Sequence, residues 1–323
     1  MLPLVGKFHI VAVSTIVAVR PLPVPNQQWL RGVAIAAVVA QAGIAVTGSV
    51  VRVTGSGLGC PTWPQCFPGS LTPVRHDDVA WLNQWVEFGN RLLISVVGLV
   101  ALACLVSAWL VRPRRPRLLA LAATMPAGVA LQAVVGGITV RTGLAWWTVS
   151  VHFLLSMVLV WLAVLLVRAS GEGDEPARPL VTARGRALLV AAVGLLAALL
   201  TAGTFVTAAG PHAGDADTPR LDVAVETLAR VHSGVLFAFL AVLVALGLTM
   251  PRTPRYWTLV AVVLAQGALG FVQYFTGVPE VLVSLHVLGA ASVVIATAAL
   301  WVSTRDRGAP AEHPVQTREL AHA

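Results

Sequence analysis

The chain has 323 residues, of which 57% are hydrophobic and only 11% are charged, and its mean hydropathy is +0.82. Soluble domains carry about 25% charged residues, so this composition excludes an ordinary soluble enzyme and indicates a membrane protein. The formal net charge of +8 could indicate a nucleic-acid-binding protein. The basic residues instead occupy short segments between apolar runs, as in a membrane-topology signal, and we predict no nucleic-acid partner.

Eight apolar stretches are long enough to span a bilayer, which needs about 20 mostly apolar residues. They are residues 30–51, 85–111, 118–140, 148–167, 187–208, 227–250, 256–276 and 281–302. The first apolar run, residues 10–19, is too short to span, so residues 1–29 are predicted to form a cytoplasmic or interfacial segment. The expected fold class is therefore an all-α membrane protein of eight transmembrane helices in contact with membrane lipid.

The basic residues are distributed unevenly between the two ends of these spans. The N-terminal segment, the connections 112–117 and 168–186, the PRTPR loop and the C-terminal tail together hold 16 Lys and Arg residues, whereas the alternate loops hold four. Loops rich in Lys and Arg stay on the cytoplasmic side. The sequence therefore predicts a multi-pass protein of the cell membrane with both termini in the cytoplasm.

Two of the three cysteines, Cys60 and Cys66, lie in one polar loop of sequence CPTWPQC. That loop is predicted to face outward, where a disulfide can persist. The alternative is a metal site, for which the loop offers only His76 as a further ligand. Cys104 lies inside an apolar run and is predicted to be a packing residue.

An internal repeat is visible at a constant offset of 134 residues, between residues 132–152 and 266–286. The matched pairs include Gln132 with Gln266, Gly136 with Gly270, and His152 with His286. A weaker alignment sets EFGNR (residues 87–91) against ARVHS (residues 229–233), which places Asn90 opposite His232. Each half holds four spans, so both halves enter the membrane from the same side.

The repeat predicts two four-helix bundles related by an axis along the membrane normal, that is, a parallel repeat. The N-terminal half covers residues 30–167 and the C-terminal half residues 187–302. A cytoplasmic linker, residues 168–186, joins them, and residues 303–323 form a cytoplasmic tail.

Three histidines lie inside the predicted spans, each four or five residues from the outer end: His152, His232 and His286. Ionisable groups at such depth are costly and usually face the interior of the bundle with a partner. Imidazoles on facing helices of a four-helix bundle commonly hold haem iron. We therefore predict haem on His232 and His286; the alternative is a structural pair of hydrogen-bonded histidines. The remaining histidines are predicted to be solvated: His9, His76, His212, His313 and His322.

The first half differs, because the position opposite His152 is Asn90, and a carboxamide is a poor iron ligand. Glu87 lies three residues before Asn90, on the same helical face and in the same layer. It is either a catalytic group or the partner of an ion pair with Arg91 or Arg230. Each arginine is predicted either to reach lipid headgroups or to contact haem propionates.

With these features the chain resembles the haem A synthase family over roughly residues 30–302. The resemblance rests on the eight spans, the paired cysteines, the EFGNR motif and the three histidines on the fourth, sixth and eighth spans. It implies an oxidoreductase that converts the methyl group at ring position eight of haem O into a formyl group, giving haem A for cytochrome c oxidase. Haem O synthase and cytochrome c oxidase assembly factors are the implied partners.

The resemblance also assigns roles to residues. It implies a haem b cofactor on His232 and His286, for which Arg230 is, by its own position on the sixth span, a candidate propionate contact. Haem O would bind in the first half beside His152, Asn90 and Arg91, with Glu87 as the catalytic group. Asn90 departs from the family pattern E-x-x-H-R, which argues against two-histidine binding of the substrate iron and leaves open whether His152 is its one protein ligand. Two other functions fit the same residues: a haem b electron carrier without substrate chemistry, and a membrane transporter that uses the histidines as proton sites.

Overall fold

The computed structural model describes residues 25–309, so the predictions for residues 1–24 and 310–323, with His9, His313 and His322, lie outside it. All eight helices of the described part are long and apolar enough to span a membrane, which confirms the all-α membrane fold. They are α1 (Gln27–Val53), α2 (Trp81–Leu110), α3 (Pro116–Arg141), α4 (Trp146–Ser170), α5 (Ala183–Ala209), α6 (Val225–Thr249), α7 (Pro254–Phe275) and α8 (Glu280–Ser303). Two short strands, β1 (Arg178–Pro179) and β2 (Arg305–Asp306), pair antiparallel.

Each helix begins one to four residues before the apolar stretch that predicted it. Polar capping residues account for several of these extensions. The side chain of Asn26 accepts a hydrogen bond from the backbone N–H of Trp29 at 2.8 Å, and Thr182 and Thr253 cap α5 and α7 in the same way. A cap satisfies a backbone donor at the helix end, so the helix continues into polar sequence that hydropathy alone excludes.

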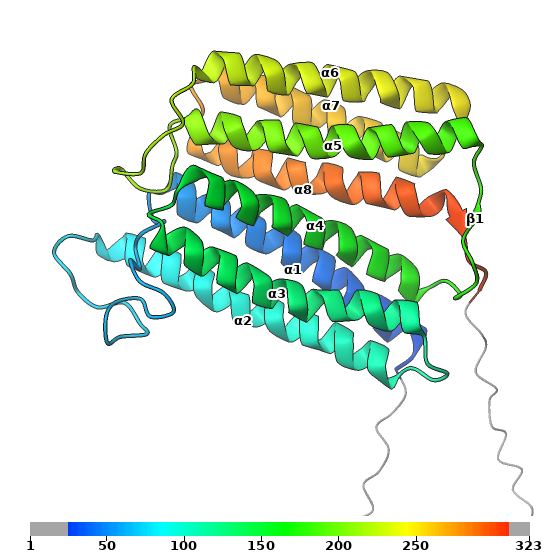
Figure 1. Ribbon diagram of the computed structural model, residues 1–323, viewed down its shortest axis with the longest axis horizontal. Helices are drawn as coiled ribbons and strands as arrows, with labels where there is room; N and C mark the ends of the chain where they lie inside the picture. Colours follow the sequence, from blue (N-terminus) through cyan, green and yellow to red (C-terminus); the bar gives the residue numbers. More distant parts are fainter. Residues whose placement is uncertain (1–24, 310–323) are drawn as a thin grey trace, which may run out of the picture.

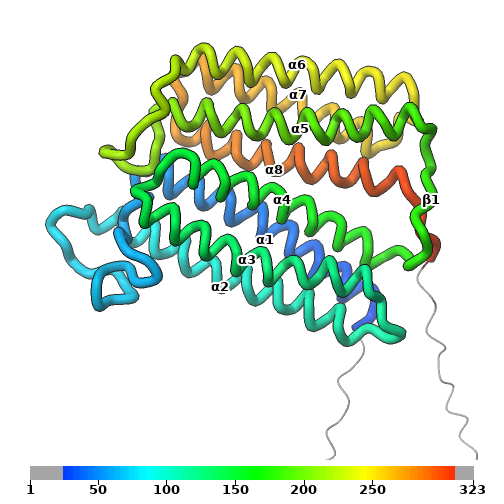
Figure 2. Tube along the Cα trace, viewed as in Figure 1, coloured from blue at the N-terminus to red at the C-terminus, as the bar shows by residue number. Residues whose placement is uncertain are grey.

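The helices form two groups of four, α1–α4 and α5–α8 (Figures 1 and 2). In the first group each helix packs along two neighbours, which closes the bundle on all four sides. In the second group the hairpins α5–α6 and α7–α8 are closely packed, but α6 meets α7, and α5 meets α8, over only a short stretch. The groups join where α8 packs against α1 and α4 and, over a shorter stretch, where α5 packs against α4. The second bundle is therefore the more open one.

The turns α3–α4 and α7–α8 share one backbone conformation. Leu144 and Val278, which are 134 residues apart, both have positive φ angles, of 58° and 59°. In each turn the backbone N–H of this residue donates to a carbonyl five residues earlier, in Thr139 and Gln273 respectively. A positive φ is costly for such side chains, so the repeated sequence encodes the same unusual turn twice. The parallel relation between the two whole halves stays a prediction.

The described ends of the chain lie together at the arginine-rich end of the molecule, and the loop before α2 lies at the opposite end (Figure 1). At the arginine-rich end, the side chain of Glu172 is buried and bonds to Arg117 and Arg168. The backbone N–H of Gly173 donates to the carbonyl of Gly308 at 2.7 Å. These bonds and the β1–β2 pair attach the linker to the segment that follows α8.

Candidate functional site

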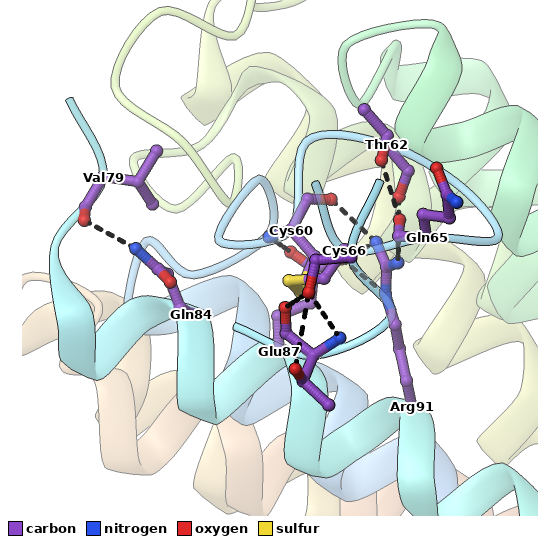
Figure 3. Close-up of a disulfide and its surroundings, with 10 residues drawn as sticks. Cys60, Thr62, Gln65, Cys66, Val79, Gln84, Glu87 and Arg91 are labelled. Carbon is purple, nitrogen blue, oxygen red and sulfur yellow. Dashed lines mark hydrogen bonds and ion pairs between the residues drawn. A yellow bond between two sulfur atoms is a disulfide. The ribbon is translucent and has the colours of Figure 1, made fainter. Parts of the chain in front are cut away.

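The loop between α1 and α2 contains the predicted disulfide, between Cys60 and Cys66 (Figure 3). Both cysteines are fully buried, and they pack with Phe67 against Phe88 of α2. The metal-site alternative fails because both sulfurs are bonded, and residues 25–309 contain no group of three His, Cys, Asp or Glu side chains that could hold an ion. Cys104 is buried among apolar side chains, as predicted.

Reduction of this disulfide, or Cys60→Ser with Cys66→Ser, should lower the stability of the folded loop by about 2–3 kcal/mol, because the unfolded loop regains conformational freedom. Thermal unfolding in detergent, with and without reductant, measures this change. A membrane-impermeant thiol reagent should label the intact chain only after reduction, since Cys104 is buried. Two thiols that react without reduction would contradict the disulfide.

Glu87 and Arg91, four residues apart on α2, hold this loop in place (Figure 3). One carboxylate oxygen of Glu87 accepts from the Nε of Arg91 at 3.1 Å and from its Nη2. The other oxygen accepts from the backbone N–H of Cys60 at 2.7 Å. The remaining Arg91 donors bind the carbonyls of Cys60, Thr62 and Gln65. All five N–H donors of the guanidinium are therefore used.

These bonds of Glu87 and Arg91 concern the two roles that the sequence leaves open for Glu87, a catalytic group or the partner of an ion pair. The carboxylate forms the ion pair with Arg91, and not with Arg230, whose side chain is exposed and has no hydrogen-bond or ion-pair partner among residues 25–309. Glu87 is only 5% exposed. A contact between Arg91 and a propionate would require the arginine to release part of the loop.

The loop lies directly over the ends of α2 and α3. A side chain at Gly59 would collide with the backbone carbonyl of Asn83, so only glycine allows the loop to approach α2 this closely. The ring of Trp63 packs on Gly137 of α3, and Arg141 donates to the Trp63 carbonyl at 3.3 Å. The disulfide loop is thus a fixed cover at one end of the first bundle.

The polar residues of the membrane layer lie at matched positions along their helices. Glu87 and His152 are six residues after the first residue of α2 and α4, His286 is six after the start of α8, and His232 is seven after the start of α6. At 1.5 Å per residue this is roughly 9–10 Å from the helix end. The predicted depth of four or five residues was wrong because the helices begin earlier than the apolar stretches.

His232 and His286 face each other across the second bundle, from its diagonal helices α6 and α8. Their ring centroids are 6.4 Å apart and the rings are inclined by 56°. Two imidazoles that bind one metal ion from opposite sides, each at about 2 Å, place their ring centres roughly 6 Å apart. The observed spacing can therefore accommodate a metal between the rings.

Each of the three histidines lies against a glycine of the preceding helix. A Cβ added at Gly203 would lie 3.1 Å from the ring of His232, one at Gly270 would lie 3.1 Å from the ring of His286, and Gly136 makes the looser equivalent contact with His152 at 3.4 Å. In all three rings Nδ1 is buried without a hydrogen-bond partner among the described residues. Buried polar atoms are nearly always paired, so these imidazoles fit a ligand better than a dry core.

The first bundle contains no second histidine opposite His152. Asn90, at the corresponding position of α2, accepts a hydrogen bond from the hydroxyl of Thr47 on α1 at 2.7 Å. Gln132 donates to the backbone carbonyl of His152 at 3.1 Å, as Gln266 does to that of its counterpart in the second bundle at 2.9 Å. In both bundles, therefore, a glutamine supports the histidine of the last helix. The bundles differ on their second helix, which carries Asn90 in the first bundle and His232 in the second.

The loop between α5 and α6 contains a histidine for which the prediction was wrong. His212, predicted to be solvated, is half-buried, and its Nε2 lies 2.9 Å from the carbonyl oxygen of Val278. This contact holds the positive-φ turn that leads into α8 and thereby His286. His212 lies in a polar loop just after α5, and nothing in the sequence of that loop indicates a contact with the distant turn. His76 is exposed, as predicted.

Comparison with known proteins finds one family throughout. A family model described as cytochrome oxidase assembly protein matches residues 29–298. A protein named heme A synthase from Azorhizobium caulinodans is 29% identical over 325 residues, covering 84% of this chain and 91% of the relative. One of the same name from Symbiobacterium thermophilum is 33% identical over 158 residues, 48% of this chain.

The extent of these matches varies. A heme A synthase from Geobacillus thermodenitrificans is 37% identical over 54 residues, or 17% of this chain. This alignment spans 15% of that relative's length, and the Symbiobacterium alignment spans 50%. The chain therefore aligns with half or less of some curated relatives and with nearly the whole length of others.

Proposed function

Because the chain belongs to the cytochrome oxidase assembly protein family, we propose that it is a haem A synthase, an oxidoreductase that converts the C8 methyl group of haem O into the formyl group of haem A. The observation that carries this proposal is the asymmetry of the two bundles. In the second bundle two histidines face each other at a spacing that fits a metal between them, whereas the first bundle has one histidine, His152 on α4, and a buried carboxylate, Glu87 on α2. That division suits one cofactor and one substrate.

In the second bundle His232 and His286 would hold haem b. Their ring spacing, the glycines behind the rings and their unpaired Nδ1 atoms support this assignment. Haem b supplies one-electron transfer when it is bound. The rings of the two histidines pack against Gly203 and Gly270, which limits their orientation. Arg230, exposed on α6, is a candidate contact for a propionate.

In the first bundle, His152 would bind the iron of the substrate haem O from one side only, because Asn90 is engaged with Thr47. Glu87 would position water or move a proton at its carboxylate, while Arg91 holds the loop that excludes bulk water from above. Two successive two-electron oxidations by an external oxidant would each replace a C–H bond of the methyl group with a C–OH bond, and loss of water from the resulting geminal diol would leave the formyl group.

The cellular setting follows from the charge distribution and from the substrate. The arginine-rich end would face the cytoplasm, so the disulfide loop and the histidine layer lie toward the outer face of the cell membrane. Haem O synthase would supply the substrate, and cytochrome c oxidase assembly factors would receive the product.

The pigment of the purified full-length protein separates this proposal from the two alternatives. A synthase should retain one haem b per chain, together with transient haem O or haem A. Two permanent haem b groups would indicate an electron carrier, and a colourless protein would indicate a transporter. Either of these results would overturn the proposal.

The glycines behind the histidines allow a matched test. Gly270→Ala places a methyl group 3.1 Å from the ring of His286, closer than ordinary contact, so the ring must shift. We expect weaker or spectrally altered haem b. Gly136→Ala meets His152 at an ordinary 3.4 Å in the other bundle and should leave the haem b spectrum unchanged. Identical spectra for both variants would contradict this assignment of the second bundle.

A further inference from the structure

A cavity of about 460 Å³ lies at the arginine-rich end of the second bundle. It is lined by the first turns of α5, the last turn of α8 and the residues around β1, which Figure 1 shows side by side. The disulfide loop and the histidine layer lie toward the other end of the helices. The volume is within the range of about 300–1,000 Å³ typical of ligand sites, so this cavity is large enough for a ligand of its own.

Small side chains on α5 leave this space open. Ala183 and Ala187 face the cavity where larger residues would fill it, and Trp301 of α8 forms another part of its wall. Leu189 and Val190 extend the apolar lining along α5. Leu189 is buried, whereas Val190 is 59% exposed on the outer surface of the helix. The lining therefore runs from the end of the bundle onto a surface that faces membrane lipid.

Two guanidinium groups, those of Arg186 and Arg305, also line the cavity. Within the part of the chain that the structure describes, neither has an ion pair or a side-chain hydrogen bond. Arg305 lies over the ring of Trp301, 4.1 Å from its centroid. Partial burial, and then the like charges of Arg307 and Arg117, lower the pKa of Arg305 below its ordinary value. Both arginines can therefore accept an anionic partner.

The nearby carboxylates do not supply that partner. Glu172 is bonded to Arg117 and Arg168. Asp306 is exposed, and its side chain accepts a hydrogen bond from the backbone N–H of Gly308 at 3.0 Å. The cavity thus combines unneutralised positive charge at the end of the bundle with an apolar wall along α5.

We propose that this cavity binds one anionic glycerophospholipid, with its phosphate between Arg186 and Arg305 and an acyl chain along Leu189 and Val190. Basic pockets between helices at the cytoplasmic side of a membrane bind anionic headgroups. A free phosphate would satisfy the arginines but would leave the apolar wall in water. A bound lipid would join the linker, α5 and the end of α8 where the two halves of the chain are connected.

The test uses the purified, delipidated full-length protein, titrated with dioleoyl phosphatidylglycerol and followed by native mass spectrometry. One lipid should bind per chain in preference to phosphatidylcholine, and millimolar inorganic phosphate should not displace it. Arg186→Gln and Arg305→Gln should each weaken binding about fivefold, the effect of one basic side chain at an anionic surface. Arg184→Gln, an exposed arginine of α5 outside the cavity, is the matched control and should change nothing.

A second variant, Ala187→Phe, fills the cavity without changing its charge and should abolish binding of the single lipid while circular dichroism stays unchanged. Equal binding of the two lipids, equal effects of Arg184→Gln and Arg186→Gln, or unaltered binding by Ala187→Phe would each overturn the proposal. Displacement by inorganic phosphate would show a phosphate site alone. Binding only after deletion of residues 310–323 would show that the chain's own tail occupies the cavity, and would also overturn it.

Discussion

His286→Ala should remove haem b from the purified protein and lower its haem content by about tenfold or more, since even the outer partners of a metal ligand contribute that much to affinity. His286 and His232 are the two facing imidazoles of the second bundle, 6.4 Å apart, and two strong imidazole ligands give a six-coordinate, low-spin haem. His232→Ala should have the same effect. Absorption spectra and the haem-to-protein ratio measure it.

The matched control is His152→Ala, because this residue has the same support in the first bundle but no facing histidine. It should leave the low-spin spectrum intact while substrate binding is lost. An unaltered low-spin spectrum in the purified His286→Ala protein would refute the cofactor assignment.

Glu87→Gln should reduce haem A formation by about 100-fold or more, the usual contribution of a group that transfers protons, with the singly oxidised intermediate accumulating. Glutamine retains an oxygen that can accept the N–H of Cys60, but it cannot titrate. Haem b content and the fold should therefore stay near normal. Chromatography of extracted haems measures the product, and haem spectra measure the cofactor.

The structure makes a second control necessary, because Glu87 also holds the disulfide loop. Asn83→Ala removes another bond between α2 and the loop, from the side-chain amide to the carbonyl of Gly55 at 3.0 Å, without touching the carboxylate. It should change haem A formation only a little. If Asn83→Ala reproduces the loss, loop position is the cause; if Glu87→Gln forms haem A at the unmutated rate, Glu87 is structural.

The sequence predicted the fold well because each helix carries its own apolar stretch, which hydropathy detects without any tertiary information. It placed the helix ends less well, because side chains such as Asn26 and Thr182 extend helices into polar sequence by local hydrogen bonds. The open second bundle was not predicted, since contacts between α6 and α7 depend on how the hairpins pack.

The sequence identified the residues of the candidate site, but it did not predict most of the contacts between them. The cysteine pair and the repeated histidines are visible in the spacing of the chain. The Glu87–Arg91 pair follows from four-residue spacing on a helix, but the use of every Arg91 donor depends on the path of an irregular loop that no periodicity describes. His212 was missed for the same reason, because its partner, Val278, lies in a distant turn.

Conversion of haem O into haem A by this chain can be measured in whole cells. The chain is expressed in cells that make haem O but no haem A, and the extracted haems are separated by chromatography. We expect a haem A peak, accompanied by its hydroxylated precursor, that disappears with His152→Ala. A chain that is folded and loaded with haem b, in cells whose haem O remains wholly unconverted, would contradict it.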